Sequence, residues 1–148
     1  MKKYFLLVLA LLAFSSCTKK ETGYTRACGS LEKNLQTLEK VMLQSPVTAA
    51  NVKKARDLNS RLCLLDLEDA YHASIKEGKT SDYNTLLRVS TYRLIALRDK
   101  SRQRVASMSE KESQVYFYAL MALSDNVTML WRHYYPDDRH VTEAVLSH

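Results

Sequence analysis

The chain contains very few residues that break helices: three glycines and two prolines among 148 residues. Sandwiches and barrels need a turn every few residues, and turns rely on glycine and proline. This scarcity excludes a turn-rich β-fold and favours long helices. Pro46, Gly78 and Pro136 each stand between long stretches without a breaker, so we expect helices to begin or end there.

Apolar residues three and four positions apart divide the chain into helical stretches. We expect helices over about 28–44, 46–77 with Ser45 as N-cap, 82–106 and 110–135, and a short terminal helix over 141–146. A capping box at Ser109 and Glu112 announces the fourth helix. The expected inner faces are Cys28, Leu31, Leu35, Leu38 and Met42; Ala55, Leu58, Leu62 and Leu65; Tyr83, Leu87, Ser90, Leu94, Leu97, Ser101 and Val105; and Tyr116, Leu120, Leu123, Val127, Leu130 and Tyr134.

The turns between these stretches bring the same leucines to matching heights. In an antiparallel helix pair, residues equidistant from the connecting turn face each other. The sequence therefore predicts an all-α fold, an up-down antiparallel four-helix bundle formed by residues 28–148. Its central layers would be Leu65, Leu94 and Leu123, and Leu62, Leu97 and Leu120.

The beginning of the chain has the composition of an export signal. Lys2 and Lys3 precede an apolar run over residues 4–14. As a helix this run would be roughly 16 Å long, about half of the ~30 Å hydrocarbon core of a bilayer. We therefore interpret residues 1–16 as a secretory signal peptide that is removed, and not as a permanent membrane span.

The segment Phe14-Ser15-Ser16-Cys17 resembles the lipobox of bacterial lipoproteins. The resemblance implies that Cys17 is acylated, with a diacylglyceryl group and usually a third chain such as palmitate, and becomes the first mature residue. Thr18, where an aspartate would hold the protein at the inner membrane, implies the outer membrane, facing the periplasm; an inner-membrane anchor is the alternative. Residues 17–27 would be a lipidated tether. Ordinary signal cleavage, giving a soluble periplasmic protein, is the other alternative.

The chain has three cysteines, an awkward number for an exported protein. If Cys17 carries lipid, Cys28 and Cys63 remain as a pair, equidistant from the turn at Ser45 and Pro46. In the oxidising periplasm they are predicted to form a disulfide. The alternatives are two buried free thiols or a metal pair. A metal would need further ligands, and no histidine lies near either cysteine in the sequence.

The sequence matches none of the catalytic templates that we compared with it. It lacks a Gly-x-Ser-x-Gly elbow, a glycine-rich phosphate loop and a His-Glu-x-x-His motif. His133, Asp137, Asp138 and His140 surround Pro136, but such clusters at a helix end are usually solvated. We therefore predict no enzymatic activity, no cofactor and no metal. The formal charge of +6, or +4 once the two lysines of the signal are removed, is too small to indicate nucleic-acid binding.

Two groups of residues are candidates for binding a partner. Residues 88–104 of the third helical stretch include six basic residues against the single acid Asp99, which marks either a solvated face or a site for an acidic partner or anionic lipid. The fourth stretch has apolar residues, several of them aromatic, around most of its circumference, so some remain outside one buried stripe, and tyrosine and tryptophan are common interface anchors. The candidates are Arg93, Arg98, Arg102 and Arg104 from the third stretch, and Phe117, Tyr118 and Trp131 from the fourth.

Together these features predict a non-enzymatic docking or assembly lipoprotein of the envelope, with another envelope protein as its partner. The chain looks like the small helical lipoproteins that assist envelope machines. In architecture it loosely resembles the pilotins of type II secretion, which hold a helix of the secretin in a groove. The alternative is an exclusion or immunity lipoprotein of a plasmid or phage. A cell-wall enzyme or inhibitor is a third hypothesis, and no catalytic constellation favours it.

Overall fold

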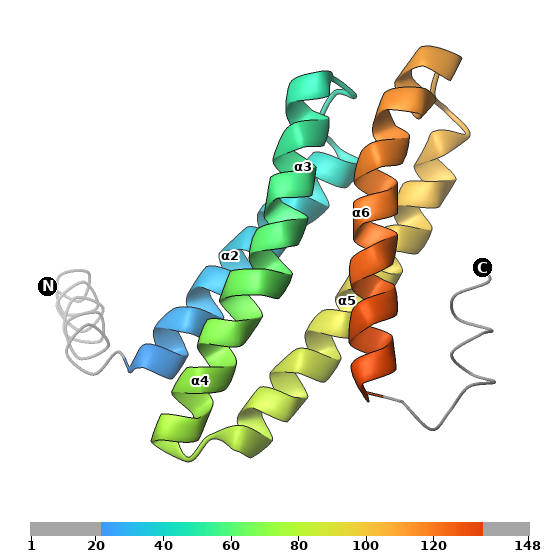
Figure 1. Ribbon diagram of the computed structural model, residues 1–148. Helices are drawn as coiled ribbons and strands as arrows, with labels where there is room; N and C mark the ends of the chain where they lie inside the picture. The colour runs from blue at the N-terminus through green and yellow to red at the C-terminus, as the bar shows by residue number, and fades with distance from the viewer. Residues whose placement is uncertain (1–21, 135–148) are drawn as a thin grey trace, which may run out of the picture.

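The computed structural model describes residues 22–134, and every element in that range is helical (Figure 1). The predicted all-α class is therefore confirmed for these residues. The predicted signal peptide, Cys17 and the terminal helix over 141–146 lie outside them, as do Asp137, Asp138 and His140. The elements are α2 (Gly23–Leu43), α3 (Ala49–Arg61), the π-helical η1 (Leu62–Asp66), α4 (Leu67–Glu77), α5 (Thr80–Val105) and α6 (Glu110–Tyr134).

Helix α2 begins at Gly23, five residues before the predicted helix start at Cys28. Thr22 caps it: the Thr22 hydroxyl accepts a hydrogen bond from the Thr25 N–H at 3.2 Å. The Glu77 carboxylate, at the end of α4, accepts a second one from the Tyr24 N–H at 2.8 Å. These bonds satisfy N–H groups that the first turn of a helix leaves unpaired. Residues 23–27 therefore belong to the helix.

The other helix ends agree with the sequence in two cases out of three. Gly78 adopts a left-handed conformation (φ +67°) and ends α4, as predicted. The Glu112 N–H donates to the Ser109 hydroxyl at 3.2 Å, so Ser109 is the N-cap of α6 as predicted, and the Ser109 hydroxyl donates in turn to the Glu112 carboxylate. The N-cap of α3, however, is Thr48 and not Ser45, since the Asn51 N–H donates to the Thr48 hydroxyl. Pro46 consequently lies in the connection between α2 and α3.

A π-helical turn, η1, interrupts the long helix predicted over 46–77. The Leu67 N–H bonds the carbonyl of Leu62, five residues back, in place of the usual four. One extra residue rotates all later positions by about 100° around the helix axis. As a result Leu65, predicted to be in the core, is 55% exposed, while Asp66 and Leu67 are buried. The predicted layer that joins Leu65 to Leu94 and Leu123 is therefore wrong at Leu65.

Most of the remaining core agrees with the predicted inner faces, although Val41, Val52 and Ala119 are also buried and Leu58, Val105 and Leu120 are only half-buried. Leu94 and Leu123 are buried together, as are Leu62 and Leu97, with Leu120 half-buried beside them. The buried apolar cluster joins all the helical elements. It comprises Leu31, Leu35, Leu38, Val41, Met42, Val52, Ala55, Leu62, Leu67, Leu87, Leu94, Leu97, Tyr116, Ala119, Leu123, Val127 and Leu130.

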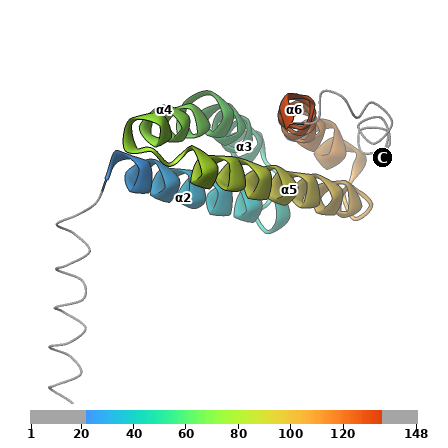
Figure 2. The ribbon, with the colours of Figure 1, turned by 90° about the horizontal axis from the view of Figure 1, so that it is seen from below.

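The helices do not pack uniformly along the molecule. Helix α2 lies against α3, η1, α4 and α5, and α6 lies against α3 and α5. Helix α4 instead packs mainly on α2 and α5, so α4 and the C-terminal half of α6 diverge, as both views show (Figures 1 and 2). They diverge at the end of the molecule where α2 begins, and α5 lies between them there.

Candidate functional site

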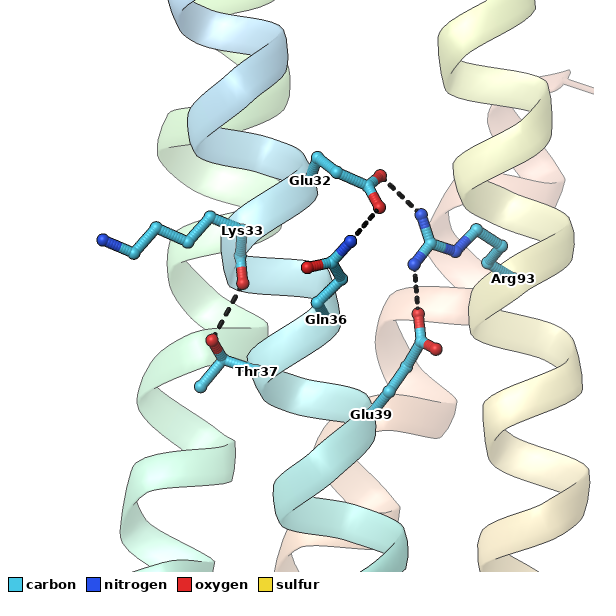
Figure 3. Close-up of polar contacts among 6 residues, drawn as sticks. All are labelled: Glu32, Lys33, Gln36, Thr37, Glu39 and Arg93. Carbon is cyan, nitrogen blue, oxygen red and sulfur yellow. Dashed lines mark hydrogen bonds and ion pairs between the residues drawn. The ribbon is translucent and has the colours of Figure 1, made fainter. Parts of the chain in front are cut away.

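Arg93, the first of the predicted basic partner-binding residues, is engaged by two acids of α2. Its guanidinium donates to the Glu32 carboxylate at 2.6 Å and to Glu39 (Figure 3). Partial burial alone would lower the pKa of Arg93, but the hydrogen bonds that Arg93 donates to the two carboxylates, together with their charges, outweigh it and raise that pKa. Arg93 therefore connects α5 to α2, and its charge is balanced within the chain.

Arg104 holds the C-terminal end of α2. It donates to the Met42 carbonyl at 2.7 Å and to the Ser45 carbonyl at 2.6 Å. The Tyr116 hydroxyl donates to the same Met42 oxygen at 2.8 Å, and the Arg104 guanidinium lies 5.7 Å from the centre of the Tyr116 ring. Side chains of α5 and α6 thus pair carbonyls that the end of a helix leaves without partners.

The other two predicted arginines are also partly or wholly inside the molecule. Arg98 is only 2% exposed, and it lies 3.4 Å from Asp99. Its burial, and then the nearby charge of Arg102, lower its pKa. Arg102 is half-buried. The four arginines therefore do not form one open basic surface, because Arg93 and Arg104 bond α2 and the connection after it, and Arg98 is buried.

The predicted aromatic residues separate into two kinds. Phe117 and Tyr118 are exposed and line an open groove of about 760 Å³ beside the turn between α5 and α6, with Val105, Val115 and Leu120. Trp131 is buried, and its ring lies 6.3 Å from that of Tyr92 in α5. Phe117 and Tyr118 are thus available to a partner, whereas Trp131 packs within the molecule.

The structure does not bring Cys28 and Cys63 together, and both are free thiols. Ser30 and Asn34 of α2 both donate to the Asp66 carboxylate, at 3.2 and 2.7 Å. Asp66 is therefore level with the part of α2 between Ser30 and Asn34. Cys63 precedes Asp66 by three residues, in a segment that runs antiparallel to α2, so it is level with a position of α2 about seven residues beyond Cys28, roughly 10 Å along the axis. A disulfide needs Cα atoms about 4–7 Å apart. The connection between α2 and α3 is centred at Pro46, close to the predicted turn, so the offset arises beyond the turn, where the Asp66 contacts set how α2 lies against η1 and α4.

A second groove lies where α4 and α6 diverge, and we call it the α4–α6 groove. It has a volume of about 500 Å³ and draws its walls from η1, α4, α5 and α6. The rings of Tyr71 and Tyr83 lie 5.4 Å apart at a tilted angle of 58°. The lining is mainly apolar and aromatic and includes a few polar groups. It consists of Cys63, Leu67, Glu68, Tyr71, Tyr83, Asn84, Leu87, Leu130 and His133.

The electrostatic environment of this groove favours neutral groups. Burial raises the pKa of the Cys63 thiol to about 12. Burial, and then the neighbouring Tyr71, also raise the pKa of the Tyr83 hydroxyl. Both groups are protonated at neutral pH, and a thiol in that state is a poor nucleophile. The groove is suited to burying an apolar surface.

Sequence reasoning missed this groove. Tyr83 was expected only in the core, and Tyr71 was not expected at any site. A mainly polar α4 containing Tyr71 and Ile75 four residues apart was the available signal, because residues at that spacing share a helix face. The rotation introduced by η1, which decides which face of α4 is exposed, has no comparable signal in the sequence.

Among residues 22–134, no three histidine, cysteine or acidic side chains gather closely enough to hold a metal ion. Over the same range no helix is both long and apolar enough to span a bilayer. No family model, curated protein or solved structure matches the chain.

Proposed function

We propose that the protein is a non-enzymatic docking lipoprotein of the bacterial cell envelope. In this proposal it is anchored in the outer membrane through an acylated Cys17 and holds a helix of another envelope protein in the α4–α6 groove. The single observation that carries the proposal is this groove: an apolar, aromatic-lined hollow of about 500 Å³ between helices that diverge. We also propose that the helices form the up-down antiparallel four-helix bundle expected from the sequence.

The lining of the groove supports docking of an apolar helix face. Leu67, Leu87 and Leu130 provide an aliphatic floor from three different helices. Binding sites are typically concave and apolar with a small number of polar groups, and tyrosine is among the residues that contribute most to binding. A helix that lays its apolar stripe along such a groove replaces water at these side chains.

The exposed face of α4 extends this surface. Tyr71 lines the groove, and Ile75 follows it one turn later on the same face of the helix. Both side chains are about half exposed. A partner helix that lies along α4 would cover both, so the contact would extend beyond the hollow itself.

The position of the groove supports a partner at the membrane surface. Tyr83 and Asn84, which line it, belong to the first turns of α5, and α5 begins beside the start of α2: Lys79 lies 5.5 Å from the ring of Tyr24. The five residues between Cys17 and Gly23 reach at most about 18 Å when extended. Acylation of Cys17 would therefore keep this end of the molecule close to the bilayer.

Site-specific photo-crosslinking in intact cells tests the docking site. A photoreactive phenylalanine analogue in place of Tyr71 is expected to give one discrete adduct with an envelope protein. The same analogue at Val89, an equally exposed apolar position on α5, is the matched control and is expected to give none. The adduct at Tyr71 should disappear when Ile75→Glu is added. No adduct at Tyr71, or equal adducts at both positions, would contradict the proposal.

The anchor is tested separately by mass spectrometry of the amino-terminal peptide of the mature protein. The expected peptide begins at Cys17 and carries the mass of a diacylglyceryl group, with or without a third acyl chain. An unmodified Cys17, or a mature chain that begins after it, would remove the membrane from the proposal without affecting the crosslinking result.

A further inference from the structure

The outward face of α6 is an apolar surface separate from the α4–α6 groove. Phe117, Tyr118, Met121 and Met129 are 56%, 55%, 45% and 48% exposed. Met121 and Leu130, nine residues apart, point to opposite sides of the helix, and Leu130 lines the groove. Exposed apolar residues that cluster on one face mark an interaction surface more often than scattered ones do.

Charged residues at the two ends of α6 continue the line of this face. Glu110, Met121 and Arg132 are spaced eleven residues apart, three helical turns, so they lie in one line along the helix. Glu110 lies in the first turn and Arg132 in the last. Both are exposed. The face therefore has an acidic end and a basic end, each roughly 16 Å from Met121, and its middle is apolar except for the exposed Asp125, one turn after Met121.

This order of charges is complementary to itself when one copy of the helix is reversed. If a second α6 lies antiparallel with the two Met121 side chains at the two-fold axis, each Glu110 faces the Arg132 of the other copy. A two-fold interface requires this kind of self-complementarity, because the same patch serves both partners. The antiparallel orientation also sets the helix dipoles in the favourable sense.

We propose that the outward face of α6 binds a second copy of this chain, in an antiparallel α6–α6 contact centred on Met121. The contact buries Phe117 and Tyr118, which sequence analysis selected as partner-binding residues, against the other copy. It leaves the α4–α6 groove open on the opposite side of the helix. A dimer of this kind presents two grooves, one from each copy.

Cysteine crosslinking of the purified full-length chain tests the contact. The background variant carries Cys17→Ser, Cys28→Ala and Cys63→Ala, so that the introduced cysteine is the only thiol of the chain, and copper phenanthroline is the oxidant. Because Met121 lies on the proposed axis, Met121→Cys is expected to form a disulfide-linked dimer readily. Val89→Cys, on α5, is the control and is expected to remain monomeric. Equal crosslinking at the two positions, or none at position 121, would overturn the proposal; the latter result would assign the face to another occupant.

Charge reversal in the Met121→Cys background identifies the register. Glu110→Arg alone, or Arg132→Glu alone, places like charges opposite each other at two positions and is expected to lower the crosslinked fraction about fivefold. The double substitution Glu110→Arg with Arg132→Glu restores opposite charges and is expected to restore crosslinking. If the double variant crosslinks no better than the single variants, the antiparallel register is wrong. Circular dichroism of each variant checks that the helices remain folded.

Discussion

Arg104 shows how a basic side chain in this chain serves the structure. The last carbonyl groups of a helix have no partner within it. Arg104 supplies two donors to the end of α2, at the Met42 and Ser45 carbonyls, and Tyr116 supplies a third. Three helices therefore meet at one set of backbone oxygens. The pattern of charges along α5 does not reveal this, because charge alone does not distinguish a solvated arginine from one that caps a neighbouring helix.

Replacing Arg104 with methionine keeps the length and the apolar stem of the side chain and removes its donors. Hydrogen bonds from a charged donor typically contribute 1.5–3 kcal/mol. We therefore expect Arg104→Met to lower the free energy of unfolding by about 1.5–3 kcal/mol, measured by urea denaturation followed by circular dichroism. Lys100→Met, at an exposed position one turn earlier, is the control and should change it by less than about 0.5 kcal/mol. Equal losses in the two variants would contradict a capping role.

At the scale of the element, η1 is the feature that separates the expected fold from the observed one. The spacing of the apolar residues correctly predicts helices along the chain, because burial of a stripe at 3.6-residue periodicity determines them. The same spacing fails at Leu65, because a π turn adds one residue and rotates everything after it. Asp66 takes the inward position and is satisfied by Ser30 and Asn34. These tertiary contacts decide the local geometry and leave no local signal.

The candidate binding surfaces likewise divide into one that the sequence predicts and one that it does not. Phe117 and Tyr118 were identified from the sequence because α6 has more apolar residues than one buried stripe needs. The α4–α6 groove could not be identified, since it depends on how far α4 turns away from α6 after η1. The exposure of Tyr71 is a consequence of that turn.

The extra residue of η1 makes a specific deletion tolerable. Removing Leu64, the most exposed large apolar residue of this turn, should return η1 to the ordinary i−4 pattern and leave the buried faces of α3 and α4 as they are. We expect the free energy of unfolding to change by no more than about 1 kcal/mol, since no buried side chain is lost.

Deleting Ala96, an exposed residue in the regular part of α5, is the control. It should rotate Leu97 out of the core by about 100° and unfold the protein. Thermal unfolding followed by circular dichroism measures both. Equal damage from the two deletions would show that η1 is not a tolerated insertion.

At the scale of the whole molecule, the register between the helices and the proposed export to an oxidising compartment favour opposite states of the two cysteines. An oxidising compartment favours a disulfide wherever two thiols can meet. The bonds from Ser30 and Asn34 to Asp66, however, hold Cys28 and Cys63 roughly 10 Å apart along the helix axes, beyond the reach of a disulfide. If the helices keep this register, both thiols remain reduced even outside the cytoplasm.

Thiol titration of the mature, never-reduced protein decides between these states. In denaturant we expect two reactive thiols, Cys28 and Cys63, because the proposed acylation would block Cys17. In the native protein Cys63 should react about a thousandfold more slowly than in denaturant, since burial raises its pKa to about 12 and only the thiolate is nucleophilic. Cys63→Ala is the matched control and should leave one reactive thiol. A count of zero would mean that the helices shift enough to bring the cysteines together, and a count of three would mean that Cys17 carries no lipid.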